Sequence, residues 1–146
     1  MDLKYKKLYE DTIIPTQGSA AAAGYDLYAH IPSDAVEILP HKTIKIGTGI
    51  AIALPDGTFG GIFARSGLAS KKGLRPANCT GVIDSDYRGE VIVALHNDSD
   101  KIQTIENSER IAQLIILNYT TPTWTEVEDL DETDRGQGGF GSTGTN

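Results

Sequence analysis

Short apolar runs rich in Val and Ile recur along this chain of 146 residues, and proline, glycine or a polar turn follows each within several residues. Ile50, Ile52 and Leu54 alternate with Ala51 and Ala53, and the turn-forming sequence Pro-Asp-Gly follows at once. Such alternation is typical of half-buried strands, and many short strands separated by turns are typical of sandwiches and barrels. The pattern therefore predicts an all-β fold, with strands at residues 4–8, 25–29, 36–39, 43–46, 49–54, 60–64, 81–83, 90–96, 102–105 and 111–119.

Length and charge narrow the class of protein. A chain of this size fits one domain with one core. The net charge of −7 argues against a nucleic-acid or membrane-surface partner, because phosphate backbones attract Lys and Arg. It does not exclude a small phosphate ligand held by a few cations. The single Cys79 leaves no intramolecular disulfide and no Cys-based zinc cluster. Without a signal-like or membrane-spanning run, we expect a soluble cytoplasmic protein.

Residues 66–73 break the β pattern. Ser66 stands where an N-cap belongs, Gly73 stands where a helix ends, and lysines fill the last turn. The segment therefore predicts a helix of one or two turns. Its free N–H groups and the neighbouring Arg65 would suit a phosphate. An ordinary capped helix explains the same residues, and such helices are commoner than anion sites.

Residues 81–89 join two apolar runs through a polar turn. Val82 and Ile83 end the first run, and the second begins at Glu90. The simplest geometry is a β-hairpin whose tip is flanked by Asp84 and Tyr87. Such a tip would hold a carboxylate beside an aromatic ring. A charged turn without a function explains the same residues equally well.

Two polar residues stand out inside apolar strands. Asp26 falls on the strand face opposite Leu27, where a plain surface aspartate is the simpler interpretation. Gln113 is the one polar side chain in the run at residues 111–117.

The C-terminal part of the chain changes composition. Acidic residues follow one another from Glu126 to Asp134, and a glycine-rich stretch follows Arg135. Its glycines match the spacing G-x-G-x-x-G, but that fingerprint needs a strand before it and a helix after it. The composition indicates a flexible arm whose exposed N–H groups can approach an anion. A disordered Gly/Ser-type tail is the alternative, although Phe140 and Arg135 favour an arm that folds over a ligand.

Five segments of this sequence, in this order, resemble the motifs of the trimeric dUTPases, which hydrolyse dUTP to dUMP and pyrophosphate. They lie at residues 23–29, 64–69, 81–89, 110–115 and 135–144 and span nearly the whole chain. The resemblance implies a distorted jelly-roll or β-clip subunit with one short helix. It also implies a homotrimer with C-terminal arm exchange and three active sites at subunit interfaces. Residues 1–128 would form the core, and residues 129–146 would form an acidic spacer and an arm that closes over a site.

The resemblance assigns roles around residues 78–87. Asp84 matches the general base that activates a water for in-line attack on the α-phosphorus. Tyr87 matches the ring that packs under deoxyribose and excludes a 2′-hydroxyl. Asn78 matches the residue that reads the uracil edge, since an amide offers both a donor and an acceptor. The backbone of Gly81, Val82 and Ile83 would complete that base pairing.

The remaining matched positions would hold phosphates and the closing arm. Arg65, Ser66 and Gly67 match phosphate-binding positions, and Gln113 matches a phosphate-side amide. In the arm, Phe140 would stack on uracil, while the γ-phosphate would be held by Arg135, Ser142 and Thr143, and Gly141 is a further substrate-binding position. Mg²⁺ is implied as a cofactor that bridges the phosphates and retains several waters. Asp26 resembles a partner to that water shell.

The activity implied by the resemblance keeps uracil out of DNA and supplies dUMP for thymidylate synthesis. Two alternatives keep the fold and change the function. A dCTP deaminase-like enzyme would release ammonia, and a nucleotide-sensing regulatory trimer would act through a protein partner.

Overall fold

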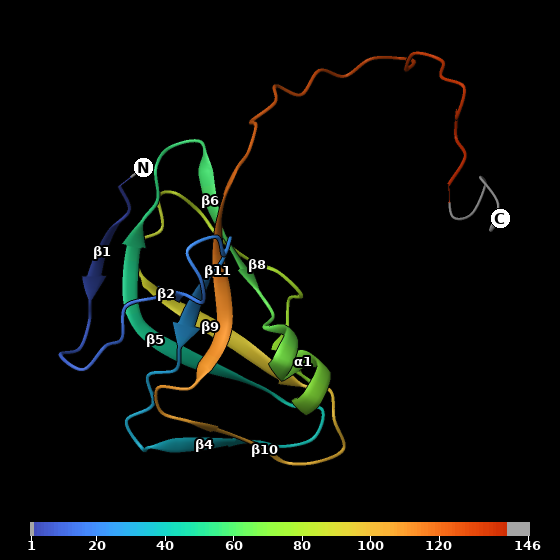
Figure 1. Cartoon of the computed structure of the whole chain (residues 1–146). Coiled ribbons are helices and arrows are strands. Elements are labelled where there is room, and N and C mark those ends of the chain that lie inside the picture. Colours follow the sequence, from blue (N-terminus) through green and yellow to red (C-terminus); the bar gives the residue numbers. More distant parts are fainter. Residues whose placement is uncertain (1, 140–146) are drawn as a thin grey trace.

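Eleven strands and one helix form within residues 2–139, which are the residues that the structure, a computed structural model, describes (Figure 1). The elements are β1 (Lys4–Lys7), β2 (Thr16–Gln17), β3 (Tyr25–Tyr28), β4 (Ala35–Ile38), β5 (Thr43–Ala53), β6 (Thr58–Phe63), α1 (Ser66–Lys72), β7 (Leu74–Pro76), β8 (Gly81–Ile83), β9 (Glu90–Asn97), β10 (Gln103–Glu106) and β11 (Arg110–Asn118). The expected all-β fold with one short helix, a distorted jelly roll, is confirmed.

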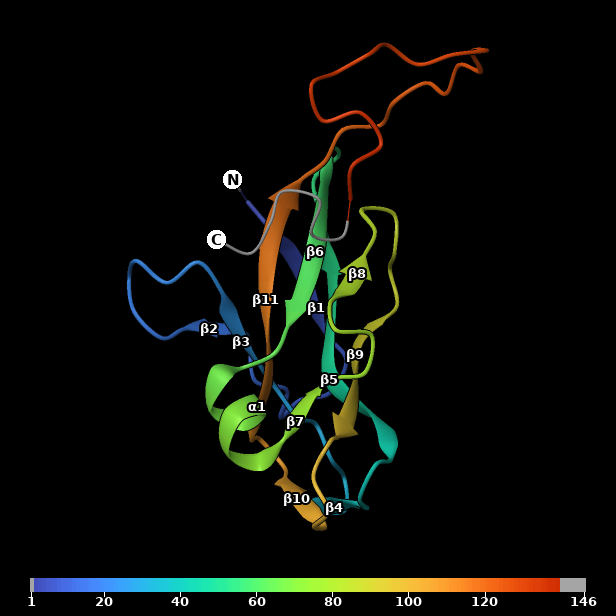
Figure 2. The same cartoon turned by 90° about the vertical axis from the view of Figure 1, so that its right-hand side faces the viewer.

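Two antiparallel sheets carry most of the structure. One has the order β1-β5-β9-β7, and the other has the order β2-β3-β11-β6-β8. Figure 2 shows the second sheet in front of the first. The hairpin-like pair β4–β10 closes one end of the molecule.

The core lies between the sheets and follows from the strand periodicity. Val91, Val93 and Leu95 of β9 are buried, while the residues between them are more exposed. They pack in one cluster with Leu27 of β3 and Leu114 of β11. Burying each aliphatic side chain of this kind contributes about 1.5–3 kcal/mol relative to leaving it in water. Residues 91–95 are apolar throughout, so the packing of the two sheets decides which face is buried, and Ile92 on the other face is 44% exposed.

The residues 81–83 and 90–97 do form strands, but the predicted hairpin between them is wrong. β8 pairs with β6, whereas β9 pairs with β5 and β7 in the other sheet. Residues 84–89 therefore cross from one sheet to the other. Packed sheets lie about 10 Å apart, a distance that a connection of six residues can span and a two-residue hairpin turn cannot.

Helix α1 occupies the predicted segment, with one correction at its start. The N-cap is Arg65, in an extended conformation and without a side-chain cap hydrogen bond, and Ser66 is already helical. The Arg65 guanidinium is engaged elsewhere, with Asp26. The predicted end is confirmed, because Gly73 takes the left-handed conformation with φ 67°. No helix within residues 2–139 is both long enough and apolar enough to cross a membrane.

The chain leaves the body after β11. Residues 119–139 contain no helix or strand and extend away from both sheets (Figure 1). The side chains of Trp124 and Leu130 on this segment are 92% and 84% exposed.

Candidate active site

An ion-paired cluster forms where β3, β11 and the start of α1 meet. The Asp26 carboxylate accepts a hydrogen bond from Arg65 Nε at 2.8 Å and another from Arg110 Nη1 at 3.1 Å. The side chain of Asp26 is only 14% exposed, so both arginines are held by a largely buried anion. Asp26 is therefore more than a plain surface aspartate, because it orients two guanidinium groups.

Gln113 belongs to the same cluster. It lies opposite Asp26 in the pairing of β3 with β11, so the two side chains share one face of the sheet. Its Nε2 donates a hydrogen bond to the carbonyl of Ala64 at 2.8 Å. A Cβ at Gly24 would stand 2.6 Å from Gln113 Oε1, so only glycine leaves room for this amide.

Ser66 and Gly67 extend the cluster to the surface. Both residues are exposed, and a Cβ placed on Gly67 would meet no atom within 4 Å. Open backbone N–H groups beside guanidinium and amide donors suit an anion. We call the set of Asp26, Arg65, Ser66, Gly67, Arg110 and Gln113 the Arg65 cluster.

Two adjoining hollows lie along β8. The first, about 180 Å³, is lined by Asn78, Gly81, Val82 and Ile83 together with Ile62, Pro76, Ile92, Val93 and Ala94. The second, about 190 Å³, is lined by Asp84, Tyr87 and Glu90 together with Val82, Ile83 and Ile92. They adjoin, because Val82, Ile83 and Ile92 line both, and the first also contains the Asn78 amide while the second contains the Asp84 carboxylate. We call them together the β8 hollow.

The loop that carries Asp84 and Tyr87 is held by its own hydrogen bonds. Tyr87 N donates to the Asp84 carbonyl at 3.1 Å, and Tyr87 Oη donates to the Glu90 carbonyl at 3.0 Å. Arg88 Nη1 donates to the carbonyls of Ser85 and Tyr87. A Cβ at Gly89 would overlap the Tyr87 ring in its present position, so the ring would have to shift. The exposed Asp84 carboxylate is thus presented beside a fixed ring, as a base that must meet a water requires.

Sequence reasoning assigned no role to Glu90 and Arg110. Glu90 Oε1 accepts a hydrogen bond at 2.7 Å from the backbone N–H of Gly49, where β5 bulges and Gly49 has φ 69°. It thereby ties the end of the Asp84 loop to the neighbouring sheet strand. Arg110 contacts Asp26 from 84 residues away. No local pattern signals either contact, because each partner is distant in the sequence.

The β8 hollow and the Arg65 cluster lie apart in one chain. Ile83 pairs with Gly60 near the start of β6, whereas Arg65 follows the end of β6. Five residues of extended chain separate Gly60 from Arg65, on the order of 16 Å at the rise of a strand. Figure 2 shows the loop after β8 and the start of α1 at opposite ends of β6. The structure therefore gathers the predicted residues into two groups and does not bring Asp84 to Arg65.

The predicted arm residues join neither group. Arg135 is exposed on the extended segment, and its Nε donates to the Gly138 carbonyl at 2.9 Å. Phe140, Gly141, Ser142 and Thr143 lie outside the described residues.

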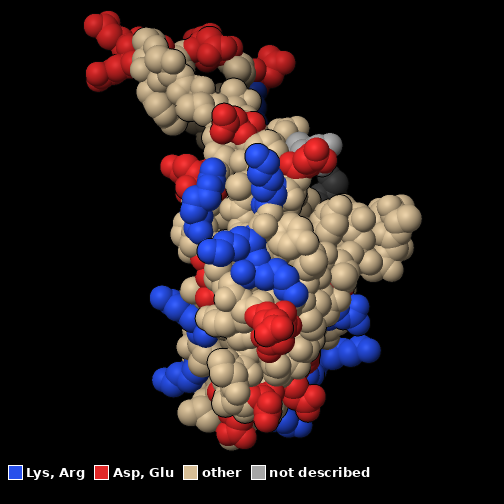
Figure 3. Space-filling view, turned by 90° about the vertical axis from the view of Figure 1, so that its left-hand side faces the viewer, with Lys and Arg blue, Asp and Glu red and all other residues tan. Residues whose placement is uncertain are grey.

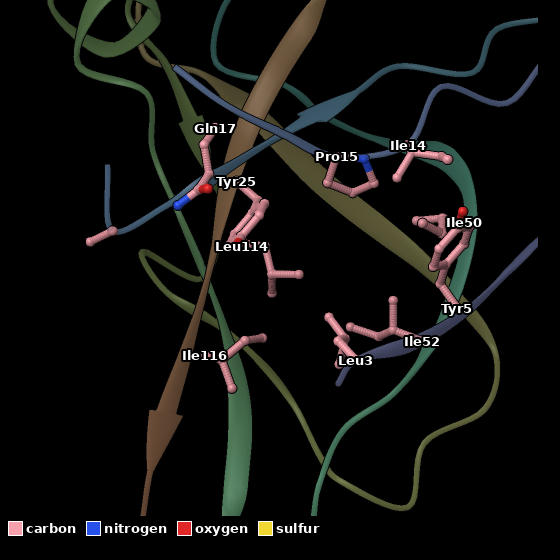
Figure 4. Close-up of a pocket in the computed structure, with 11 residues that line it drawn as sticks. Leu3, Tyr5, Ile14, Pro15, Gln17, Tyr25, Ile50, Ile52, Leu114 and Ile116 are labelled. Atoms are coloured by element: carbon pink, nitrogen blue, oxygen red, sulfur yellow. The ribbon is translucent and has the colours of Figure 1, made fainter. Parts of the chain in front are cut away.

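A larger hollow, about 520 Å³, opens between the two sheets at their β1 and β2 edges (Figure 4). Apolar side chains dominate its lining, which consists of Leu3, Tyr5, Ile14, Pro15, Gln17, Ala23, Tyr25, Ile50, Ile52, Leu114 and Ile116. It contains none of the predicted site residues. We call it the inter-sheet hollow and regard it as a packing surface, since it lacks convergent charged groups.

A hollow that places an acid and an aromatic ring together, and a separate surface with two arginines and an amide, are features of the class of proteins that bind phosphorylated organic ligands. The family model described as dUTPase matches residues 10–144. The chain therefore belongs to the dUTPase family.

Curated relatives agree over nearly the full length. A deoxyuridine 5'-triphosphate nucleotidohydrolase from Oryza sativa subsp. japonica is 49% identical, covering 97% of this chain and 80% of the relative. One with the same name from Hydrogenobaculum sp. is 46% identical, covering 99% of both chains.

Solved structures show the same fold. The dUTPase of Staphylococcus bacteriophage 80alpha, a mutant with dUpNHpp, superposes with a TM-score of 0.88 at 29% identity and covers 99% of each chain. A mutant dUTPase from phage phi11 of S. aureus, which coordinates a structural Mg(II) ion, superposes with a TM-score of 0.77 at 26% identity. That match covers 88% of this chain and 98% of the phage protein.

Proposed function

We propose that this protein hydrolyses dUTP to dUMP and pyrophosphate. Beyond the family membership, one observation carries the proposal, namely that Asp84 and Tyr87 line one hollow and Asn78 lines the hollow that adjoins it. This activity removes dUTP before it can enter DNA and supplies dUMP for thymidylate synthesis.

Asp84 acts as the general base. Its exposed carboxylate can accept a proton from a water that attacks the α-phosphorus in line with the departing pyrophosphate. The hydrogen bonds within residues 84–89 hold the backbone that carries the carboxylate, which reduces the entropy lost when the base is positioned for the reaction.

The β8 hollow selects the nucleoside. The Asn78 amide and the backbone of Gly81, Val82 and Ile83 can pair with the uracil edge, since they offer donors and acceptors together. The Tyr87 ring lies under deoxyribose and leaves no room for a 2′-hydroxyl. Both hollows are small, which suits a pyrimidine and a sugar better than a purine nucleoside.

The Arg65 cluster binds the phosphates. Arg65, Ser66, Gly67 and Gln113 offer guanidinium, hydroxyl, backbone and amide donors on one exposed surface. Each Asp26 oxygen accepts one arginine and keeps a further lone pair, so Asp26 can also accept from a water.

Mg²⁺ is the proposed cofactor, and the residues fit a metal that arrives with its nucleotide. Residues 2–139 contain no group of three or more His, Cys, Asp or Glu that could hold a metal ion. The phosphates would therefore provide most of its ligands, with Asp26 accepting from one of its waters. When bound, Mg²⁺ supplies neutralisation of the phosphate charge.

A complete site requires more than one copy of the chain, and we propose the homotrimer. Within one chain the β8 hollow and the Arg65 cluster are separated by much of the length of β6, whereas the α-phosphorus and its neighbouring phosphates are directly linked. The β8 hollow of one protomer would therefore face the Arg65 cluster of its partner.

The C-terminal segment has the features of an exchanged arm. Its apolar Trp124 and Leu130 need a cover that their own protomer does not provide. A partner offers the inter-sheet hollow (Figure 4) and, beside it, a basic surface formed by Lys4, Lys6 and Arg88. Figure 3 shows basic side chains gathered on the face that β1 presents, and acidic side chains along the arm. The opposite charges favour docking.

The end of the arm would close the site. Beyond the core at residues 1–128, residues 129–146 would bring Arg135, Gly141, Ser142 and Thr143 to the γ-phosphate and Phe140 to the uracil ring. Closure of this kind excludes water other than the nucleophile.

A panel of nucleotides tests this function. The protein is incubated with Mg²⁺ and separately with dUTP, dTTP, dCTP and UTP, and pyrophosphate and ammonia are measured. Pyrophosphate from dUTP alone is the expected result. Ammonia from dCTP would replace the proposal with a deaminase, and no product from any nucleotide would leave a binding or regulatory role.

A further inference from the structure

We propose that Arg75 is a positioning residue for base recognition. Together with Asp98 it fixes the turn at residues 76–79, which carries Asn78 into the β8 hollow. The inference rests on the proposed function, because it assigns the uracil contact to Asn78. Sequence reasoning gave no role to Arg75, Asp98 or Cys79.

The Arg75 guanidinium joins three segments of the chain. It donates to both oxygens of Asp98, from Nε at 2.6 Å and from Nη2 at 3.0 Å. Its Nη1 donates to the Pro76 carbonyl at 3.2 Å and lies 3.9 Å from Cys79 Sγ. One planar group therefore grips both ends of the turn and fastens them to the residue that follows β9.

The turn needs such support. Cys79 has φ 61°, a left-handed conformation that a residue with a Cβ rarely adopts. Main-chain bonds hold the turn internally, from Cys79 N to the Pro76 carbonyl at 3.0 Å and from Thr80 N to the Asn78 carbonyl at 2.6 Å, and Ala77 N donates to the Ala94 carbonyl of β9 at 2.7 Å. The Arg75 contacts add the side-chain support. Asn78 is exposed, so its orientation depends on how firmly this backbone is held.

Both the short distances and the shifted pKa values indicate a firm ion pair between Arg75 and Asp98. The Arg75 guanidinium holds the pKa of the Asp98 carboxyl below its usual value, and Asp98 raises the pKa of Arg75. His96 lies on the other side of Asp98, with its Nε2 3.4 Å from Asp98 Oδ1 and its Nδ1 2.8 Å from Thr43 Oγ1. Asp98 is therefore fixed on two sides.

The role is specific to binding. Arg75 and Asp98 line neither hollow, whereas Asn78 lines the first and Asp84 lines the second. Loosening the turn should misplace the Asn78 amide, which reads uracil. The general base Asp84 and the phosphate contacts should stay unchanged. The expected signature is thus a higher KM and weaker discrimination by base, with kcat unchanged.

The test compares Arg75→Lys and Asp98→Asn with wild type. Lysine keeps the charge but cannot make the bidentate bond and reach the Pro76 carbonyl together. Asp98→Asn leaves Arg75 and the turn chemically intact, so any effect on uracil binding must travel through the pair. Asp100→Asn is the matched control. Asp100 lies two residues after Asp98 and also accepts a surface hydrogen bond, from His41 at 2.9 Å.

We expect Arg75→Lys and Asp98→Asn each to raise the KM for dUTP by about tenfold and to lower the preference for dUTP over dCTP. Their kcat should stay within about twofold of wild type. The double variant should have a KM no higher than that of either single variant, because both changes break the same pair. Asp100→Asn should match wild type. An unchanged KM and an unchanged preference for dUTP over dCTP in active, folded variants would overturn the role of Arg75 but not the proposed function. So would a fall in kcat that tracks a lower melting temperature. A wild-type protein that does not hydrolyse dUTP would overturn the proposed function as well.

Discussion

Arg65 Nε lies 2.8 Å from Asp26 Oδ1, so the guanidinium is oriented by the protein itself. The pair joins β3 to the start of α1 across 39 residues of sequence. An arginine held in this way loses little side-chain freedom when a phosphate binds, which favours both affinity and a defined geometry.

Asp26→Asn should weaken both stability and catalysis. The change leaves Arg65 and Arg110 without their shared anion in a partly buried place, so the free energy of unfolding should fall by about 1–3 kcal/mol. Urea denaturation measures this loss, and kcat/KM for dUTP should fall in parallel because Arg65 is released. Asp56→Asn, in an exposed turn, is the control. Equal stability of the two variants would show that the arginines do not need Asp26.

Gly89→Ala should relax the selection against ribonucleotides. A methyl group at this position collides with the Tyr87 ring and forces it away from the β8 hollow. The ratio of kcat/KM for dUTP to that for UTP should therefore fall. Tyr87→Phe is the matched control, since it removes only the hydrogen bond to the Glu90 carbonyl and keeps the ring. Retained selectivity in Gly89→Ala would exclude Tyr87 as the steric barrier.

Removal of residues 135–146 should leave a folded trimer that hydrolyses dUTP poorly, because the γ-phosphate and uracil would lose the contacts proposed for the arm. Light scattering reports the assembly, and pyrophosphate release reports the activity. A chain that ends at residue 143 keeps the proposed contacts and should remain active. Full activity in the shorter protein would show that the arm is not part of the site.

Acid should abolish the stabilising effect of Asp98. Arg75 lowers the folded-state pKa of this carboxyl, so its contribution is present above the unfolded pKa of about 3.9 and is lost as the pH falls through the folded value. Unfolding free energies of wild type and Asp98→Asn should thus differ at neutral pH and converge below about pH 4. A difference that persists at lower pH would show that the pair acts by packing instead of charge.

Local patterns in the sequence predicted the helix and most strands, but they did not predict which strands pair with one another. The apolar run at residues 90–96 identified the strand β9, and Gly73 identified the end of α1. The expected hairpin was wrong because β8 and β9 pair with β6 and β5, whose residues lie far earlier in the chain. Adjacent strands in sequence do not have to be adjacent in a sheet.

The same distinction applies to the site. Asn78 was assigned through the family resemblance alone. That Asp84 and Tyr87 lie close together was predictable, because they flank one polar turn, and both line the second hollow. The Asp26–Arg65 contact was not, because no local spacing links a strand residue with a helix cap 39 residues away. The distance between the β8 hollow and the Arg65 cluster likewise depends on strand order, which the motifs do not encode.

The central claim is that Asp84 activates a water for attack on the α-phosphorus of dUTP. The most direct measurement is hydrolysis in ¹⁸O-labelled water, with the products resolved by mass spectrometry for wild type and Asp84→Asn. We predict that wild type places the label in dUMP. Asp84→Asn should lose about 10²- to 10⁴-fold in turnover while still binding dUpNHpp in calorimetry. Label in pyrophosphate, or near-normal turnover by Asp84→Asn, would contradict the account.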